Sequence, residues 1–437
     1  MLIWAKIGCK EDMKNVDRVW GRILIFVLCI VHLLLPIERG FPVIRIGGYP
    51  ITLSMLVSIV IFAFLFVRSG GYIVWALPKV YVPYQIIVVW IFLISALIST
   101  DVEAGLFVVL LYFITFVVDF LIIRYLFQKG FRREFSVILC IVASVAALVG
   151  IIEGVFHYYL PFYRQAFLNY NYESISYAMI RSDFRALGTL GNPLIYSVAL
   201  LLVVPFAMEI KSSLKKYLVV MLLILAFFFA VSTTALVMGV ILFVGYYILS
   251  PHKLRFVQVG LLAALAVMLW MLFISPSSDG GESSIFSSWA AEFAFGEYEN
   301  PQIRNIQIRR YLATRSLEIF WSDKSFTSVL FGHGLKSSIE AVSVLQLGSF
   351  NTFDNIYATL LFESGILGLG AYLLMGLNTL TSFRQRAKDN LHWYSVLGLF
   401  VAGISFTTIY YNTFNFVWVA SVAALLFDGS QWQGVTK

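Results

Sequence analysis

The sequence predicts an all-α fold, a polytopic bundle of about twelve transmembrane helices with a long extracytoplasmic loop that contains short helices. Of the 437 residues, 60% are hydrophobic and only 13% are charged, whereas a soluble domain is about a quarter charged. The apolar residues are gathered in runs long enough to cross a bilayer. The segments between the runs are alternately basic and non-basic, as in multi-pass membrane proteins.

The predicted spans are runs of mostly apolar residues, about 20 of which cross a bilayer. The first run follows five Lys and Arg residues near the N-terminus and lacks a small-residue cleavage site. We therefore expect an uncleaved helix rather than a signal peptide. Two of the runs meet in a tight hairpin at Ser232–Thr234. The runs are 22–38, 50–67, 83–99, 104–123, 135–160, 190–210, 216–231, 234–249, 256–274, 356–380, 393–410 and 414–428.

The positions of the basic residues predict the orientation. If the N-terminus is cytoplasmic, every second connecting segment is basic, and the others, such as 99–101 and 410–412, carry few or no positive charges. This is the positive-inside pattern, and it places both termini in the cytoplasm. The basic segments contain Arg68 and Lys79; Arg124, Lys129, Arg132 and Arg133; Lys211, Lys215 and Lys216; Lys253 and Arg255; and Arg384, Arg386 and Lys388.

The chain is expected to have three parts. Residues 1–274 form an N-terminal membrane bundle of about nine spans, with an outer loop at 161–189. Residues 275–355 form a large extracytoplasmic loop with a helical pattern from about Ile303 to Trp321. Residues 356–437 form a C-terminal membrane segment of about three spans. Loops of this length are usually functional or disordered.

Composition and motif argue against several functional classes. The net charge of +7 is accounted for by topology, so no nucleic-acid partner is expected. Cys9, Cys29 and Cys140 lack metal or redox spacing, and no nucleotide loop, zinc motif or Ser-His-Asp arrangement is visible. The chain also lacks the internal repeat and paired broken helices of many secondary transporters. We expect no metal and no cofactor.

The outer loops contain several arginines although the positive-inside rule predicts few there. These arginines either form a solvated or lipid-facing surface or bind an anion. In the helix at 303–321, Arg315 falls on a stripe at helical spacing with Arg304 and three apolar residues, Ile308, Leu312 and Ile319. Such a guanidinium needs a partner. It is either a phosphate, which arginine binds bidentately, or an acid such as Glu318 or Glu340. The outer-loop arginines are Arg164, Arg181, Arg185, Arg304, Arg309, Arg310 and Arg315.

Two further residues stand at the mouths of spans. Arg185 precedes a Gly- and Pro-containing re-entry into the membrane, where it either binds an anion near a helix N-terminus or reaches lipid headgroups. Asp354 precedes the run at 356–380 and is either a base for a hydroxyl group or a helix N-cap. Glu363, inside that run, is either functional or a paired buried acid. His333 is the single histidine of the large loop.

Taken in their order along the chain, these motifs resemble those of the superfamily of O-antigen ligases and Wzy-type O-antigen or exopolysaccharide polymerases. The resemblance covers roughly 185–370 and rests on an ordered set of three stretches. They are Arg185–Pro193, like the family's Arg-x-x-Gly segment; Arg315–Trp321 leading to Leu330–Gly334, like its Arg…Trp…Phe-Gly-x-Gly pattern; and Asp354, Asn355 and Tyr357 followed by Glu363, Gly365 and Gly368. Ligases of the family commonly have His-Asn where this chain has Asp354-Asn355, which is more like the polymerase branch.

The resemblance implies a metal-independent glycosyltransferase of the bacterial inner membrane. It would transfer glycan from an undecaprenyl-diphosphate donor to an acceptor glycan or lipid at the outer leaflet, with other polysaccharide-assembly proteins as partners. Arg185 and Arg315 would hold the diphosphate, and Asp354 would orient or deprotonate the acceptor hydroxyl. The remaining expected substrate-binding residues are Arg304, Arg309, Arg310, His333, Asn355 and Tyr357.

Three hypotheses remain open at this point. The first is a polymerase that joins lipid-linked repeat units, and the second is a ligase with another acceptor, such as lipid A-core. The third is a transporter or flippase of lipid-linked sugars, which would depend on charges inside the bundle, such as Asp119 and Glu153, rather than on charges of the outer loops.

Overall fold

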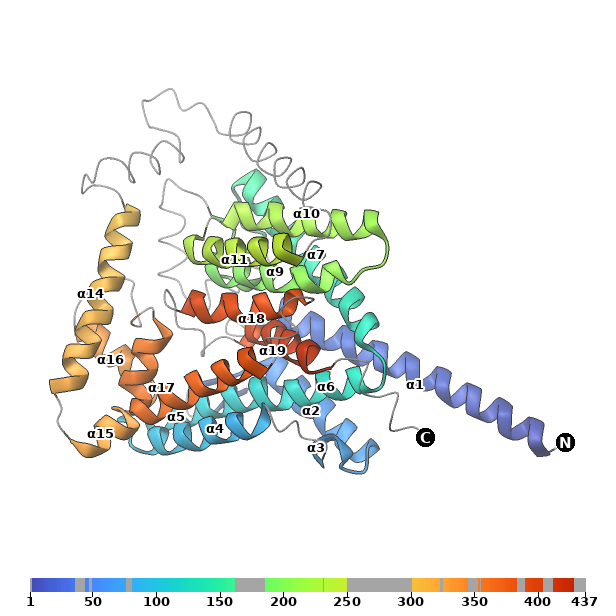
Figure 1. Cartoon of the computed structure of the whole chain (residues 1–437), viewed down its shortest axis with the longest axis horizontal. Coiled ribbons are helices and arrows are strands. Elements are labelled where there is room, and N and C mark those ends of the chain that lie inside the picture. Colours follow the sequence, from blue (N-terminus) through green and yellow to red (C-terminus); the bar gives the residue numbers. More distant parts are fainter. Residues whose placement is uncertain are drawn as a thin grey trace, which may run out of the picture.

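A computed structural model describes most of the expected bundle. The described residues are 2–35, 44–46, 49–75, 81–161, 185–230, 232–249, 301–322, 325–344, 353, 355–382, 390–403 and 412–427. Every predicted run except 256–274, which lies outside this part of the chain, contains a helix. The helical fold class is confirmed (Figure 1).

The helices of the first half begin with α1, which starts at Leu2, far ahead of the predicted start at residue 22. A two-stranded antiparallel ribbon, which the sequence did not predict, follows α1. The elements are α1 (Leu2–Leu33), β1 (Ile44–Ile46), β2 (Tyr49–Ile51), α2 (Leu53–Arg68), α3 (Tyr72–Trp75), α4 (Val82–Leu97), α5 (Val102–Phe113), the π-helix η2 (Ile114–Asp119), α6 (Phe120–Gln128) and α7 (Arg132–Phe156).

The second half contains the short helices of the large loop, and the helical pattern predicted near 303–321 is confirmed as α14. The expected tight hairpin is also present, because α10 ends at Ala230 and α11 begins at Thr233. The elements are the 3₁₀-helix η3 (Gly188–Leu190), α9 (Pro193–Met208), α10 (Ser213–Ala230), α11 (Thr233–Leu249), α14 (Pro301–Ser322), α15 (Phe326–Phe331), α16 (Ser337–Val344), α17 (Ile356–Ser382), α18 (Leu391–Ala402) and α19 (Asn412–Leu426).

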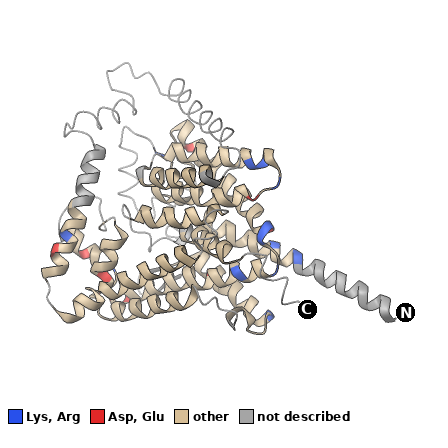
Figure 2. Ribbon diagram, viewed as in Figure 1, with Lys and Arg blue, Asp and Glu red and all other residues tan. Residues whose placement is uncertain are grey.

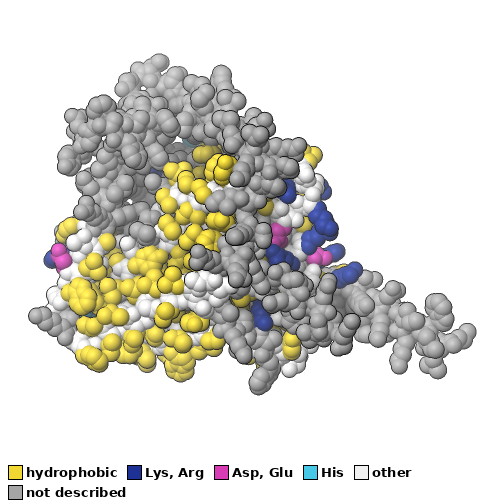
Figure 3. Space-filling model, in the orientation of Figure 1, with side chains coloured by type: hydrophobic (Ala, Val, Ile, Leu, Met, Phe, Trp, Pro, Cys, Tyr) yellow, Lys and Arg dark blue, Asp and Glu magenta, His cyan; other side chains and the backbone are white. Residues whose placement is uncertain are grey.

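Four helical segments among the described residues are long and apolar enough to cross a membrane. They are Val102–Gln128, which joins α5, η2 and α6, and then α7, α10 and α17. Shorter apolar helices accompany them in α2, α4, α9, α11, α18 and α19. Large apolar side chains, including Trp90 and Met221, are exposed on the flanks of the bundle, and hydrophobic side chains cover much of the face in Figure 3. The protein is therefore a membrane protein, while the number of spans stays a prediction.

The bundle is built around α19. All side chains from Asn415 to Leu425 are buried, as expected of a helix that is apolar all round and lies in the interior. Its Trp418 packs edge to face on Phe116 of η2 and contacts Phe400 of α18. α19 also packs against α9, α6 and α1, so the C-terminal segment is the centre of the fold rather than an appendage.

The two ends of the bundle differ in charge. Figure 1 shows the long helices running side by side, with α14 lying across one end. Lys and Arg gather toward the opposite end (Figure 2), where α7 begins and where Arg22 lies 3.6 Å from Glu134. The alternation of basic segments in the sequence thus corresponds to an asymmetry in space.

Candidate functional site at the α14 end

The centre of this site is a glycine-to-glycine contact between a loop and a kinked helix. α17 is interrupted at Gly365, where φ is +66° and ψ is −167°, a conformation that essentially only glycine adopts. Gly332, in the turn after α15, has φ +77°. A Cβ on Gly332 would lie 2.4 Å from the Glu363 carbonyl carbon, and one on Gly365 would lie 2.3 Å from the Leu330 carbonyl oxygen. The two backbones can meet only because both residues lack a side chain.

Backbone hydrogen bonds join the loop to the kink. The His333 N–H donates to the Phe362 carbonyl at 2.8 Å, and the Gly334 N–H donates to the Glu363 carbonyl at 3.1 Å. A helical kink exposes carbonyls that an unbroken helix would use internally, and the loop satisfies two of them. The Leu330–Gly334 stretch and the Glu363–Gly365 stretch therefore form one unit.

Two serines at the C-terminal end of α4 and just beyond it fasten this unit to the bundle. The Ser95 hydroxyl lies 2.9 Å from the Phe331 carbonyl and also donates to the Glu363 carbonyl. One turn later, the Ser99 hydroxyl donates to the Leu335 carbonyl at 2.9 Å. Ser95 lies in the last turn of α4, and Ser99 lies just beyond the C-terminal end of that helix. Sequence reasoning missed both residues, although two serines four residues apart in an otherwise apolar run were the available signal.

Glu363 is a paired buried acid, one of the two alternatives that the sequence left open. Its side chain is fully buried, and the Ser338 hydroxyl of α16 donates to its Oε1. Burying a carboxyl group is costly without such a partner. The contact ties α16 to α17 and so adds a second fastening beside the glycine contact.

His333 lies between aromatic rings at the same place. Its half-buried ring is 4.5 Å from the Phe362 ring and 6.2 Å from the Phe320 ring, centroid to centroid. These contacts connect α14, the loop and α17. Its proposed role toward substrate stays a prediction.

The arginine stripe expected on α14 is only partly as predicted. Leu312 is buried and Ile319 is half-buried, but the Arg315 side chain is 46% exposed, and its Nη1 lies 2.6 Å from Oε2 of Glu318. Ser316 occupies the buried face in its place, because a small hydroxyl costs far less to desolvate than a guanidinium. The expected apolar surroundings of Arg315 are thus wrong, and the alternative partner Glu318 is correct. The hydrogen bond and charge of Glu318 raise the pKa of Arg315, which is a permanent cation.

Three further predicted residues lie earlier on the same helix. Arg304, Arg309 and Arg310 belong to α14, but their side chains lie outside what the structure describes. Further along α14, Leu312, Ser316 and Phe320 are buried, and the helix packs against α17.

The residues at the start of α17 have defined structural contacts. The Asn355 side-chain oxygen accepts from the N–H groups of Tyr357 and Ala358, at 2.9 and 3.1 Å. Asn355 is therefore the N-cap of α17, a role that the sequence had offered to its neighbour Asp354. Asp354 itself lies outside the described residues. The Tyr357 hydroxyl donates to the Phe400 carbonyl of α18.

The Arg185 segment re-enters the bundle as predicted from its glycines and proline. The Glu153 carboxylate accepts from the N–H groups of Leu187 and Gly188, at 3.1 and 2.8 Å. The Thr189 hydroxyl donates to the Leu33 carbonyl at 2.6 Å, and Tyr159 donates to the Arg185 carbonyl at 3.1 Å. Arg185 is half-buried, so its guanidinium is carried on a fixed backbone. Glu153, considered for proton relay, serves here as an anchor.

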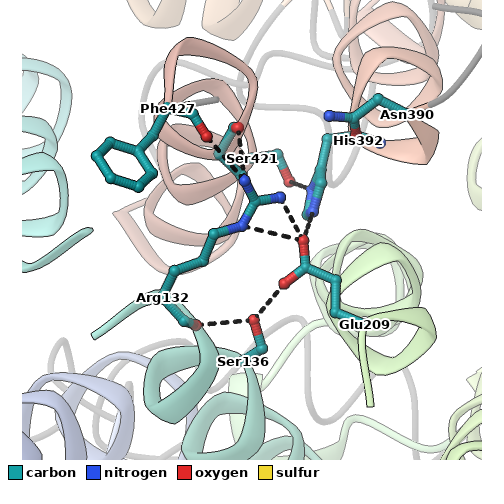
Figure 4. Close-up of polar contacts among 8 residues, drawn as sticks. Arg132, Ser136, Glu209, Asn390, His392, Ser421 and Phe427 are labelled. Atoms are coloured by element: carbon teal, nitrogen blue, oxygen red, sulfur yellow. Dashed lines mark hydrogen bonds and ion pairs between the residues drawn. The ribbon is translucent and has the colours of Figure 1, made fainter. Parts of the chain in front are cut away.

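A second polar cluster lies where α7 begins and α9 and α19 end (Figure 4). Arg132 donates from Nε and Nη2 to one oxygen of Glu209, at 3.2 and 2.5 Å. Its Nη1 donates to the carbonyls of Ala424, in the last turn of α19, and Phe427, just beyond that helix, at 3.3 and 2.8 Å. The Ser136 hydroxyl donates to the other Glu209 oxygen at 2.6 Å. Four carbonyl or carboxylate oxygens are thereby satisfied by two side chains of α7.

His392 of α18 completes this cluster. Its Nε2 lies 3.2 Å from Glu209, and its Nδ1 lies 3.3 Å from the Ser421 hydroxyl. The order serine, histidine, carboxylate matches that of a catalytic triad. However, Ser421 is 0% exposed, so no substrate reaches its hydroxyl. The cluster therefore acts as a clamp that joins α7, α9, α18 and α19. It was not predicted from the sequence.

Glu209, which lies just beyond the end of α9, is ionised throughout the physiological range. Burial alone would raise its pKa, but the hydrogen bonds and positive charge from His392 and Arg132 outweigh burial and lower the pKa to about 2. The clamp is therefore charged whenever the protein functions.

No metal site emerges from this geometry. Within the described ranges, no three His, Cys, Asp or Glu side chains are grouped so as to hold a metal ion. The cations that the structure describes include Arg315 on α14, Lys336 between α15 and α16, and Arg185 ahead of η3.

In comparisons with known proteins, no protein-family model and no curated protein matches the chain.

The substitution Gly365→Ala tests the glycine contact. We expect a loss of about 1–3 kcal/mol of stability from backbone strain alone, with a lower Tm in detergent and faster proteolysis between α15 and α16. Gly370→Ala is the matched control, because the space around a Cβ there is open. Equal Tm values for the two variants would contradict a tight backbone contact at Gly365.

The substitution Arg132→Ala tests the clamp. It leaves Glu209 without its cation, and we expect a loss of about 2 kcal/mol, below the cost of breaking a fully buried pair because both side chains are about a quarter exposed. Arg133→Ala, at the exposed neighbouring position, should leave the Tm unchanged. A clamp without structural importance would give the same Tm for both.

The pH dependence of stability provides an independent test of Glu209. Its folded pKa of about 2 lies below the ordinary value of 4.5, so its contribution is full above pH 4.5 and is lost as the pH falls toward 2. The Tm of the wild-type protein should fall over this window more steeply than that of Glu209→Gln. Parallel curves would show that the carboxylate is not stabilised by folding.

Proposed function

We propose that the protein is a metal-independent glycan polymerase of the Wzy type in the bacterial inner membrane. It transfers a growing polysaccharide from an undecaprenyl-diphosphate donor to a lipid-linked repeat unit. The α14 end of the bundle faces away from the cytoplasm, and both termini lie in the cytoplasm. Other polysaccharide-assembly proteins are expected partners.

One observation carries the proposal. Two of the stretches that resemble the polymerase and ligase superfamily, Leu330–Gly334 and Glu363–Gly365, are joined by backbone hydrogen bonds and by the close approach of Gly332 to Gly365. Residues that belong to one functional unit are expected to be assembled in this way. The basic residues at the opposite end support the orientation through the positive-inside rule.

The arginines suit a diphosphate leaving group. Arg315 is exposed and paired with Glu318, and an exposed pair of this kind is worth only about 0–1 kcal/mol. A diphosphate with greater charge can therefore compete for the guanidinium. Arg185 stands on a backbone that Glu153 fixes, so it can stabilise developing negative charge without reorganisation.

In the proposed step, an acceptor hydroxyl oxygen attacks the anomeric carbon of the donor sugar. A new glycosidic C–O bond forms while the C–O bond to the diphosphate breaks, and undecaprenyl diphosphate leaves with the electron pair. Asp354 accepts the hydroxyl proton as general base. Asn355 already caps α17, so Asp354 is not required for that role.

A transporter of lipid-linked sugars is the second candidate, and one observation favours it. Asp119 is buried in the bundle 3.6 Å from His32, and buried ionisable groups in membrane helices are often functional. A transporter would depend on Asp119, whereas the proposed transferase depends on charges at the α14 end.

Complementation of a gene-deletion strain with Arg185→Ala, Arg315→Ala or Asp354→Ala tests the proposal. Each loss should reduce polymer yield about 100-fold, as for removal of one stabilising group in a charged transition state, and leave single repeat units on the acceptor in a gel. Arg133→Ala is the control. Normal polymer in all three variants would exclude the transferase, and long polymer retained on the lipid carrier would identify a ligase instead.

A further inference from the structure

A histidine and an aspartate are paired inside the bundle, away from the proposed transfer site. The His32 Nε2 of α1 lies 3.6 Å from the Asp119 Oδ2, and the two side chains are 2% and 0% exposed. Both lie on apolar helices, α1 and the span Val102–Gln128. Ionisable side chains at such positions are rare and are retained for a reason.

A π-helix brings Asp119 to this position. The segment η2, from Ile114 to Asp119, interrupts the regular helix between α5 and α6, and all six of its side chains are buried. A π-helical turn contains an extra residue and so rotates the following side chains relative to a regular α-helix, and such turns are frequent at functional sites. Asp119 is the last residue of this segment.

The imidazole is held in place from three other elements. Its ring stacks on Phe416 of α19 with centroids 4.1 Å apart and an angle of 2°. The Ser58 hydroxyl of α2 lies 3.5 Å from Nε2, the same nitrogen that faces Asp119. The following residue, Leu33, is fixed through its carbonyl by Thr189. The ring therefore has little freedom to turn away from the carboxyl group.

The cost of burying an uncompensated charge determines how many protons the pair holds. A lone carboxylate or a lone imidazolium in an apolar bundle is costly, whereas a pair that shares one proton has no net charge. This holds for both arrangements, carboxylic acid with imidazole and carboxylate with imidazolium. Adding or removing a proton leaves one uncompensated charge.

Other titratable groups lie on the elements that pack around the pair. From residue 18 onward they are Arg18, Arg22 and Cys29 on α1; Arg132, Arg133, Glu134, Cys140 and Glu153 on α7; Glu103 and Tyr112 on α5; Arg68 at the end of α2; and Arg124 and Tyr125 on α6. Glu153 is held by the N–H groups of Leu187 and Gly188, and α19 carries no ionisable side chain from Asn415 to Phe427. Thiols and phenols are ordinarily uncharged at neutral pH. Arg68 ends α2, ten residues after Ser58 and thus about 15 Å along the helix.

We propose that His32 and Asp119 form a binding site for a single proton at the centre of the bundle. The site does not depend on the proposed transferase. Because neither side chain is accessible in this conformation, the proton can enter or leave only when α1 separates from η2 or α19 enough to admit water. Proton exchange at the pair is thereby linked to opening of the bundle.

The number of protons on the pair can be measured in the full-length protein in lipid nanodiscs at pH 7. Solid-state NMR of 15N-labelled histidine, assigned with His32→Gln, reports whether His32 is an imidazolium. Infrared spectra, assigned with Asp119→Asn, report whether Asp119 is a carboxylic acid. Glu103→Gln, at an exposed position near the start of α5, is the control and should alter neither signal.

One proton is expected, so exactly one of the two signals should be present in the wild-type protein. A neutral His32 without a carboxylic-acid band from Asp119, or both signals together, would overturn the proposal. The Tm values of His32→Gln, Asp119→Asn and the double variant give a second test that also holds if a single variant folds poorly. The two effects on Tm should be strongly non-additive, and simple addition would contradict a shared proton.

Discussion

The close approach of Gly332 and Gly365 is the contact on which the α14 end of the molecule depends. Hydrogen bonds from His333 and Gly334 to the Phe362 and Glu363 carbonyls, and the contacts of Ser95 with the Phe331 and Glu363 carbonyls, are possible only at this backbone separation. Through it, the segment between α15 and α16 is fixed to α17 and to the end of α4. On α14, which packs against α17, the side chains of Arg315 and Glu318 have defined positions.

The opposite end is held by a different kind of interaction. There, Arg132, Glu209 and His392 join four helices through charged hydrogen bonds, around the buried helix α19. The two ends suit their surroundings: a charged clamp where the basic residues gather, and an uncharged backbone contact beside the proposed substrate site. A fixed ion pair near an incoming diphosphate would compete with it, whereas backbone groups that bond each other would not.

The sequence predicted the helices well because apolar runs and turn residues are local signals. It singled out the stretches at Arg185, Gly332 and Gly365, but could not show that the last two contact each other, because that contact depends on tertiary structure. The prediction for Arg315 was wrong because helical spacing does not show which residues at the edge of a stripe are buried. Ser316 is buried instead, since its hydroxyl costs less to desolvate than a guanidinium. Asp354 and Asn355 are equally good capping residues, so only structure distinguishes them. The clamp was not predicted because its residues come from four segments that are far apart in the sequence and form no local pattern.

Release of the lipid carrier by purified protein is the most direct test of the account. The full-length protein in nanodiscs would be given a synthetic undecaprenyl-diphosphate repeat unit in the presence of EDTA. The account predicts that one undecaprenyl diphosphate is released for each glycosidic bond formed, and that chelation leaves the rate unchanged. Movement of intact lipid-linked sugar between leaflets without release of the carrier would contradict it.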